Sequence, residues 1–287
     1  MKKLRTFKIM VTFFKSLVFS FTLLFLISCQ NEERREELAA DQKAQATNQV
    51  IQDKFNAQNV FNTLPKRDLV LDLINRHKLE YNADYLSNPI NVNKFTLELY
   101  RAVNMGVYGA DVCISNSFGQ TQESVIFFKS MNNLASSLGV SSAFNQSVID
   151  RIELNKNNND SVINIITAAF EKADEILKYN NRAATAAVIL CGSWIEGFYV
   201  SCKMAEKANS TELIKTIMKQ KESLKNVIGL LENAGLEDNS KFIIDKLHGL
   251  FHSISTNESY SNFHQDTILK AYHKISDLRN QVVYVGQ

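Results

Sequence analysis

Proline and glycine are scarce in this chain, and their scarcity constrains the fold more than any other sequence feature. Only two prolines and ten glycines occur among 287 residues. Strand-rich folds need turn residues every 8–12 positions or so, whereas long helices need few. From Val50 onward apolar residues recur with helical spacing, and no segment alternates with period two over a useful length. The sequence therefore predicts an all-α fold, built as a multi-helix bundle.

Apolar periodicity and capping residues set approximate limits for the helices. The clearest amphipathic stripe lies between residues 210 and 234, where Asn209 or Ser210 is a candidate cap and Gly235 a candidate terminator. The predicted helices lie near 49–62, 66–78, 92–115, 120–138, 142–154, 160–180, 183–207, 210–234, 238–255 and 265–283.

A weak internal repeat emerges when the chain is compared with itself at an offset of about 91 residues. The aligned residues are mostly small or aromatic: Ala102, Gly106, Tyr108 and Ala110 in one copy, Ser193, Gly197, Tyr199 and Ser201 in the other. Each set begins a similar series of helices. This pattern indicates two tandem units, about 92–154 and 183–255, packed through ridges of small residues. Chance similarity between amphipathic helices is the alternative.

The first 28 residues have the composition of an export signal. A basic head precedes an apolar run from Leu17 to Ile27, and a small residue, Ser28, stands before Cys29. The run is short for a membrane span of ~20 residues, and Lys15 interrupts any longer one. An uncleaved transmembrane anchor is therefore the weaker interpretation.

Removing that leader changes the charge balance. The chain has 32 Lys and Arg against 30 Asp and Glu, and the leader holds five of the bases and no acid. The remaining 27 bases and 30 acids give a formal net charge of −3. A near-neutral exported domain lacks the electrostatic footprint of a nucleic-acid-binding protein.

The segment that ends in Leu26-Ile27-Ser28-Cys29 resembles the lipobox of bacterial lipoproteins. In those proteins the cysteine is acylated and becomes the first residue of the mature chain. The resemblance implies a signal peptide (1–28) and a membrane anchor through lipidated Cys29. The polar, charged composition that follows predicts a tether (29–48) before the all-α domain (49–287). Glu32 and Glu33 resemble the export signal of Bacteroidetes-type outer-membrane lipoproteins, although Asn31 stands where lysine is more usual. Whether the domain faces the periplasm or the cell surface stays open.

The predicted helix 183–207 contains the best candidates for a ligand-binding site. It is apolar around almost its whole circumference, which is typical of a central helix. Glu196 lies beside aromatic residues, where desolvation would raise the pKa of its carboxyl and suit it to acid chemistry or hydrogen bonding. The candidate ligand-binding residues are Trp194, Glu196 and Tyr199, with Tyr108 and Asp111 on the equivalent helix. The small-residue ridges allow two interpretations, a helix–helix contact or a ligand groove.

A metal site is a second candidate. His248 and His252 are spaced i, i+4, and Asp245 stands one turn earlier as a third potential ligand. The apolar stripe of this helix points elsewhere, and no glutamate separates the histidines as in metalloprotease helices. Solvated surface histidines are the simpler interpretation, and we expect neither a metal nor a cofactor.

Two segments resemble a known group of proteins. Residues 104–111 (NMGVYGAD) and 192–199 (GSWIEGFY) are similar to segments of predicted all-helical lipoproteins of Bacteroidetes-type bacteria. This resemblance implies an envelope location and a helical fold, and it carries over no catalytic residue. We therefore expect a binding or structural module of the cell envelope, with a protein partner or a small ligand. The alternative is a hydrolase-like or metal-using enzyme with Glu196 or the His248/His252 pair in its site.

Overall fold

Helices make up nearly all the regular structure of the described residues, and no strand occurs among them. The computed structural model describes residues 74, 76–155, 158–236, 238–255 and 265–284, all of which belong to one unit of the chain. The predicted all-α multi-helix bundle is confirmed. The leader, the tether with Cys29, the predicted helix 49–62 and most of the predicted helix 66–78 lie outside the described residues.

The α-helices of the described part follow one another with short connections. They are α3 (Glu98–Ser117), α4 (Thr121–Ser137), α5 (Gln146–Leu154), α6 (Asn159–Tyr179), α7 (Ala183–Ala208), α8 (Thr211–Met218), α9 (Lys221–Asn233), α10 (Lys241–Ser255) and α11 (Gln265–Val283). Short 3₁₀ helices are η1 (Ala83–Tyr85), η2 (Pro89–Lys94), η3 (Ser141–Phe144) and η4 (Asp238–Ser240).

Several helix ends carry the signals expected from the sequence. The side chain of Ser210 accepts a hydrogen bond from the backbone N–H of Leu213 at the start of α8, at 3.3 Å. Gly139 and Gly235, which follow α4 and α9, have φ angles of +75° and +69°. Glycine adopts such left-handed angles with the least strain, so these two residues favour the ends of their helices.

Several predicted helices differ from the observed ones. The predicted helix 142–154 is interrupted at Asn145, where the chain is extended between η3 and α5. The predicted helix 210–234 is two helices, because the chain turns at Lys219 and Gln220, where the Gln220 N–H donates to the Ile217 carbonyl at 2.9 Å. No glycine or proline marks this turn in the sequence. The predicted helix 92–115 begins at Glu98 instead, because Pro89 starts a 3₁₀ helix and the chain is extended at Leu97.

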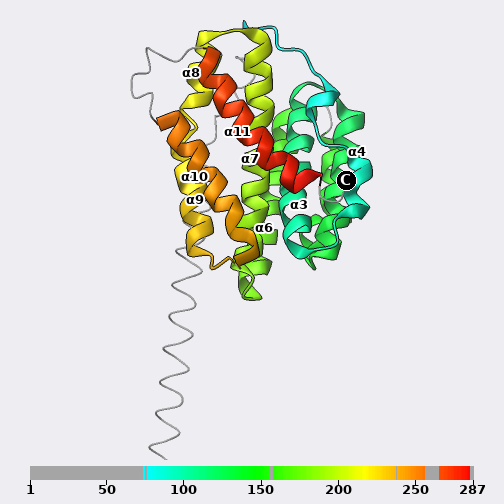
Figure 1. Ribbon diagram of the computed structural model, residues 1–287. Coiled ribbons are helices and arrows are strands. Elements are labelled where there is room, and N and C mark those ends of the chain that lie inside the picture. The colour runs from blue at the N-terminus through cyan, green and yellow to red at the C-terminus, as the bar shows by residue number, and fades with distance from the viewer. Residues whose placement is uncertain (1–73, 75, 156–157, 237, 256–264, 285–287) are drawn as a thin grey trace, which may run out of the picture. The chain divides into compact units, whose positions relative to one another are not determined.

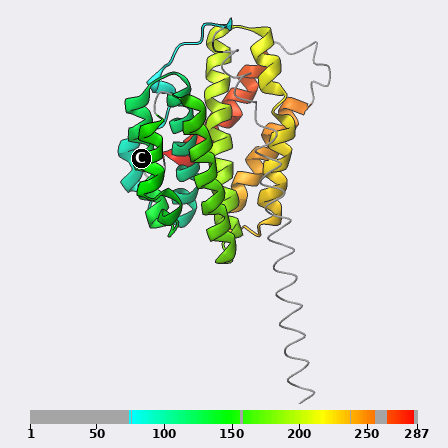
Figure 2. The same ribbon diagram turned by 180° about the vertical axis from the view of Figure 1, so that it is seen from behind.

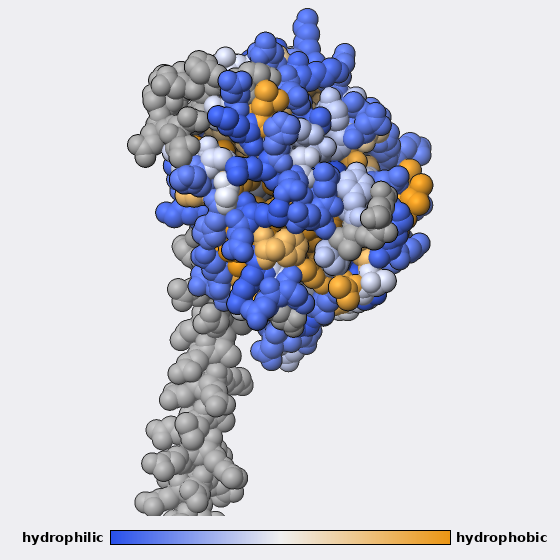
Figure 3. Space-filling model, in the orientation of Figure 1, coloured by the Kyte–Doolittle hydropathy of each residue, from blue (hydrophilic) through white to orange (hydrophobic). Residues whose placement is uncertain are grey.

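Helix α7 is the central element of the bundle. It packs against α3, α6, α8, α9 and α11, and Figures 1 and 2 show it, in yellow-green, between the α3–α6 helices and the α8–α10 helices. By length and composition α7 could also cross a membrane, but 78% of its most apolar window is buried within the described structure, as in a core helix. The face of the molecule in Figure 3 is mainly hydrophilic, with apolar residues in small separate patches.

Helices α3 and α7 approach each other through a pair of glycines. A Cβ atom on Gly106 would overlap the Ile189 carbonyl oxygen and lie 2.7 Å from the backbone nitrogen of Ser193. A Cβ on Gly192 would overlap the Val103 carbonyl and lie 2.8 Å from its carbon. Gly106, a member of the small-residue ridge predicted on α3, therefore does lie at the contact with α7. On α7, however, the glycine at the contact is Gly192, whereas a Cβ on Gly197 would meet nothing within 4 Å.

We expect the Gly106→Ala substitution to destabilise the protein by about 1–3 kcal/mol, because the added methyl group would meet backbone atoms that cannot rotate away. Gly229→Ala in α9 is the matched control. A Cβ there meets nothing within 4 Å, so it should stabilise the protein by up to ~1 kcal/mol through helix propensity. Urea unfolding followed by circular dichroism measures both. Equal effects of the two substitutions would contradict the close approach of α3 and α7.

Candidate functional site

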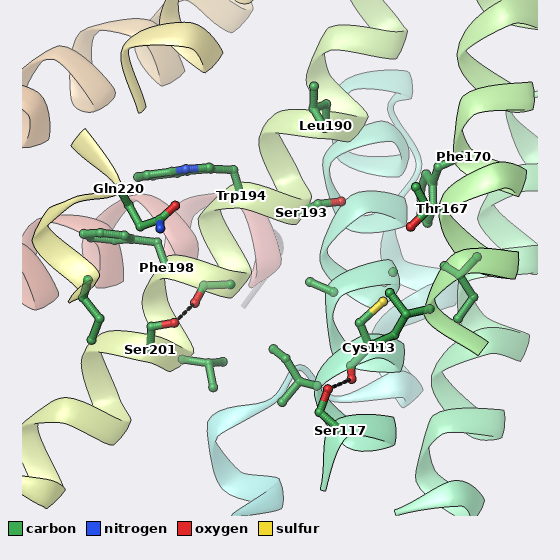
Figure 4. A pocket seen from close by; sticks show the side chains of 18 of the residues that line it. Cys113, Ser117, Thr167, Phe170, Leu190, Ser193, Trp194, Phe198, Ser201 and Gln220 are labelled. Carbon is green, nitrogen blue, oxygen red and sulfur yellow. Dashed lines mark hydrogen bonds between the residues drawn. The ribbon is translucent and has the colours of Figure 1, made fainter. Parts of the chain in front are cut away.

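A pocket of about 530 Å³ lies between α3, α6, α7 and α8. Small-molecule sites in proteins commonly occupy about 300–1,000 Å³ and are lined mainly by apolar side chains. This pocket has that character, because aliphatic and aromatic side chains from all four helices form most of its lining. Figure 4 shows Ser193 of α7 directed toward Thr167 of α6, and Trp194 and Phe198 of α7 extending to the other side, toward Gln220.

The α7 side of the pocket combines small residues with an aromatic pair. Ser193, Gly197 and Ser201, spaced four apart, lie along it. The rings of Trp194 and Phe198 stack with their centroids 4.8 Å apart and their planes 13° apart. They extend toward Gln220, at the turn between α8 and α9 (Figure 4). This pair forms a flat apolar wall.

The opposite side comes from α3 and α6. Phe170 and Thr167 lie on α6, and Cys113 and Ser117 lie on α3 (Figure 4). The Phe170 ring reaches this position because α3 carries Gly109, whose Cβ, if present, would lie 2.7 Å from a ring carbon. Burial raises the pKa of the Cys113 thiol to about 12, so the thiol is neutral at physiological pH.

Hydroxyl groups along the pocket already donate their protons to backbone carbonyls. Ser193 donates to Gly106 at 3.0 Å, across the α3–α7 contact. Ser201 donates to Gly197 at 2.7 Å, and Ser117 donates to Cys113 at 2.9 Å. Because a hydroxyl has one proton and two lone pairs, these groups are left with acceptor capacity only.

A buried ionic cluster lies beside α7 and outside the pocket lining. Glu196 of α7 and Arg279 of α11 form a two-point ion pair, with nitrogen–oxygen distances of 2.6 and 2.7 Å. Their side chains are 0% and 3% exposed. The Arg279 guanidinium also donates to the Ser87 hydroxyl at 2.9 Å and lies 4.2 Å from the centre of the Tyr199 ring. Removing one partner of such a deeply buried ion pair destabilises a protein by roughly 3–5 kcal/mol, because the other charge is left buried and uncompensated.

Asp111 of α3 completes the cluster. It has no exposed surface, and its carboxylate accepts a hydrogen bond from the Ser87 backbone N–H at 3.2 Å. Burial raises the pKa of Asp111 well above its ordinary value, and the negative charge of Glu196 raises it further. Both effects favour the protonated form of Asp111, which avoids a second negative charge beside Glu196.

The residues singled out from the sequence fall into two places. Glu196, Tyr199, Tyr108 and Asp111 gather at the ionic cluster, where Tyr108 donates to the Asn88 carbonyl at 3.0 Å. Trp194 lines the pocket instead. The structure thus brings four of the five candidates together and separates Trp194 from them. Ligand binding by these residues stays a prediction.

Sequence reasoning missed Arg279, the residue that holds the cluster together. A signal was present, because Arg279 stands four residues after Ile275, on the apolar stripe of α11. A charged residue on an apolar stripe needs a buried partner of opposite charge.

The histidine pair lies on the surface. His248 is exposed, and its Nε2 is 2.8 Å from Glu232 Oε1. His252 is also exposed. Within the described residues no three His, Cys, Asp or Glu side chains are arranged to hold a metal ion.

Comparison with protein-family models, with curated proteins and with solved structures finds no match for this chain.

We expect Asp111→Asn to change how stability depends on pH. An unfolded chain releases the Asp111 proton near pH 3.9, whereas the raised pKa keeps the proton on the folded protein. The wild-type protein therefore loses stability as pH rises from about 4 through the raised pKa, since its folded state binds more protons. The asparagine variant lacks this loss, so its stability relative to wild type should improve with pH. Urea unfolding between pH 4.5 and 9 measures the difference, and parallel pH profiles would contradict a neutral Asp111.

Proposed function

We propose that this protein is a lipid-anchored lipoprotein of the bacterial outer membrane that binds a small apolar ligand in the pocket between α3, α6, α7 and α8. The anchor rests on the sequence around Cys29, and the binding function rests on the pocket. The resemblance of two segments to predicted helical lipoproteins agrees with the envelope location. Stable anchoring needs more than one acyl chain, and a bacterial lipoprotein carries several on its cysteine.

The open space beside Gly197 is the main observation in support of a binding function. A glycine within a helix costs up to ~1 kcal/mol relative to alanine. At Gly106 and Gly192 that cost is offset, because a side chain there would prevent the α3–α7 contact. At Gly197 no atom lies within 4 Å of where a Cβ would be, and the residue lines the pocket. The missing side chain therefore leaves pocket volume open without serving the packing of the bundle.

The pocket supports binding better than the ionic cluster supports catalysis. Both carboxylate oxygens of Glu196 are engaged by Arg279, and the side chain has no surface to offer a substrate. A general acid or base must reach the proton that it transfers, directly or through one water. The cluster is better suited to holding α11 and the loop around Ser87 against α3 and α7.

We expect Cys29→Ser to abolish acylation and to release the protein from the membrane. Metabolic labelling with a fatty-acid probe, followed by membrane fractionation, measures both effects. A wild-type protein that takes up no label, and that is as soluble as the serine variant, would contradict the anchor.

Ligand binding can be followed through Trp194, which is the only tryptophan of the chain and lines the pocket. We expect the neutral apolar probe N-phenyl-1-naphthylamine to quench Trp194 emission in the mature protein by energy transfer. Gly197→Leu should weaken this binding at least about tenfold, because the new side chain occupies pocket volume.

Gly229→Leu is the matched control for that experiment. Gly229 is also a helical glycine with nothing within 4 Å of its Cβ position, but it does not line the pocket. Probe affinity in this variant should equal that of wild type. Equal binding by all three proteins would place the probe elsewhere and contradict the proposed site.

A further inference from the structure

The pocket is long relative to its volume. Its α7 lining extends from Ala186 to Met204, a distance of roughly 27 Å at the helical rise of ~1.5 Å per residue. A volume of about 530 Å³ distributed over that length is a slender groove. Such a groove fits an extended hydrocarbon chain better than a compact ring system.

The polar groups of the groove are mostly hydrogen-bond acceptors. The hydroxyls of Ser193, Ser201 and Ser117 donate their hydrogen bonds to backbone carbonyls. Thr216 does the same, donating to the Glu212 carbonyl at 3.0 Å. What these side chains present to a ligand is lone pairs, which complement a group that donates hydrogen bonds.

The charged residues that line the groove are all acidic. Two carboxylates, those of Glu171 and Asp174, belong to its lining, and none of its described lining residues is Lys, Arg or His. Asp174 forms an ion pair with Lys178 at 2.9 Å, which reduces its effect on a ligand. Glu171 is exposed and lies on the same side of α6. An anionic head group here would meet like charge and lose hydration without a cationic partner.

The aromatic wall contributes apolar surface to the groove. Trp194 and Phe198 stack on each other and are each only 4% exposed, so their rings add to the contact with a hydrocarbon chain. A fatty-acid carboxylate would be stabilised by basic side chains, and the described lining has none.

We infer that the ligand is a linear amphiphile with a positively charged, hydrogen-bond-donating head group, of the long-chain primary amine type, lying along α7 with its ammonium near Glu171. This inference rests on the proposed binding function and names its ligand class. The hydrocarbon chain contacts the aliphatic and aromatic lining, and the ammonium donates to carboxylate and hydroxyl oxygens.

Three ligands that share one hydrocarbon chain test the inference: dodecylamine, dodecanol and dodecanoate. Each is titrated into the mature protein at pH 7, below its micelle concentration, with Trp194 emission as the readout. We expect dodecylamine to bind about tenfold or more tightly than dodecanoate, with dodecanol between them. Gly197→Leu should weaken all three, which shows that they occupy the groove.

Glu171→Gln should reduce the preference for dodecylamine over dodecanoate several-fold and leave dodecanol binding unchanged. Glu175→Gln is the control, because Glu175 lies one turn further along α6, pairs with Lys172 and does not line the groove. This control should keep the wild-type preference.

The outcomes separate the two proposals. Equal or tighter binding of dodecanoate, lost in Gly197→Leu, would overturn the inferred ligand class while the binding function stands. A preference unchanged by Glu171→Gln would overturn the placement of the ammonium and with it the inference. Failure of the wild-type protein to bind any of the three ligands or the neutral probe would mean that protein atoms fill the groove, and would overturn the binding function itself.

Discussion

The close approach of α3 and α7 is the constraint on which the rest of the structure depends. Without side chains at Gly106 and Gly192, the backbones of the two helices touch directly. Because the backbones cannot be pushed further together, the angle and register of the pair are fixed within narrow limits. Every other feature is positioned by that pair: the pocket lies along one side of it, and the ionic cluster joins it to α11.

This arrangement explains why α7 is apolar around nearly its whole circumference. One face contacts α3 through Gly192, a second carries Glu196 toward Arg279, and a third lines the pocket with Ser193, Gly197 and Ser201. A polar strip of the usual kind would have no solvent to face. Glu196 is therefore accommodated inside the bundle as part of a hydrogen-bonded ion pair. The raised pKa of Asp111 disfavours a second negative charge in the same site.

The sequence predicts the helices of this fold better than it predicts the site. Apolar periodicity, the cap at Ser210 and the terminal glycines are local properties. Within the described residues the helices that they predict are observed, apart from the turn at Lys219 and Gln220, the interruption at Asn145 and the start of α3. The pocket depends on how four helices meet, and no local pattern encodes that meeting. Gly197 illustrates the difficulty: it has the same spacing as a packing glycine, and only the tertiary structure shows that nothing packs on it.

Rigidity is distributed unevenly around the pocket, and this bears on how it could select a ligand. The α3 and α7 sides are tied by glycine contacts, by the hydrogen bond from Ser193 to the Gly106 carbonyl, and through α11 by the ion pair. The α8 side is a short helix that ends at the turn before Gln220, and Gln220 itself lines the pocket. A preorganised wall discriminates ligands by shape, because little conformational freedom is lost there on binding. Under the proposed function, the α3 and α7 sides would therefore limit the cross-section of the ligand, and Glu171 of α6 would select its head group.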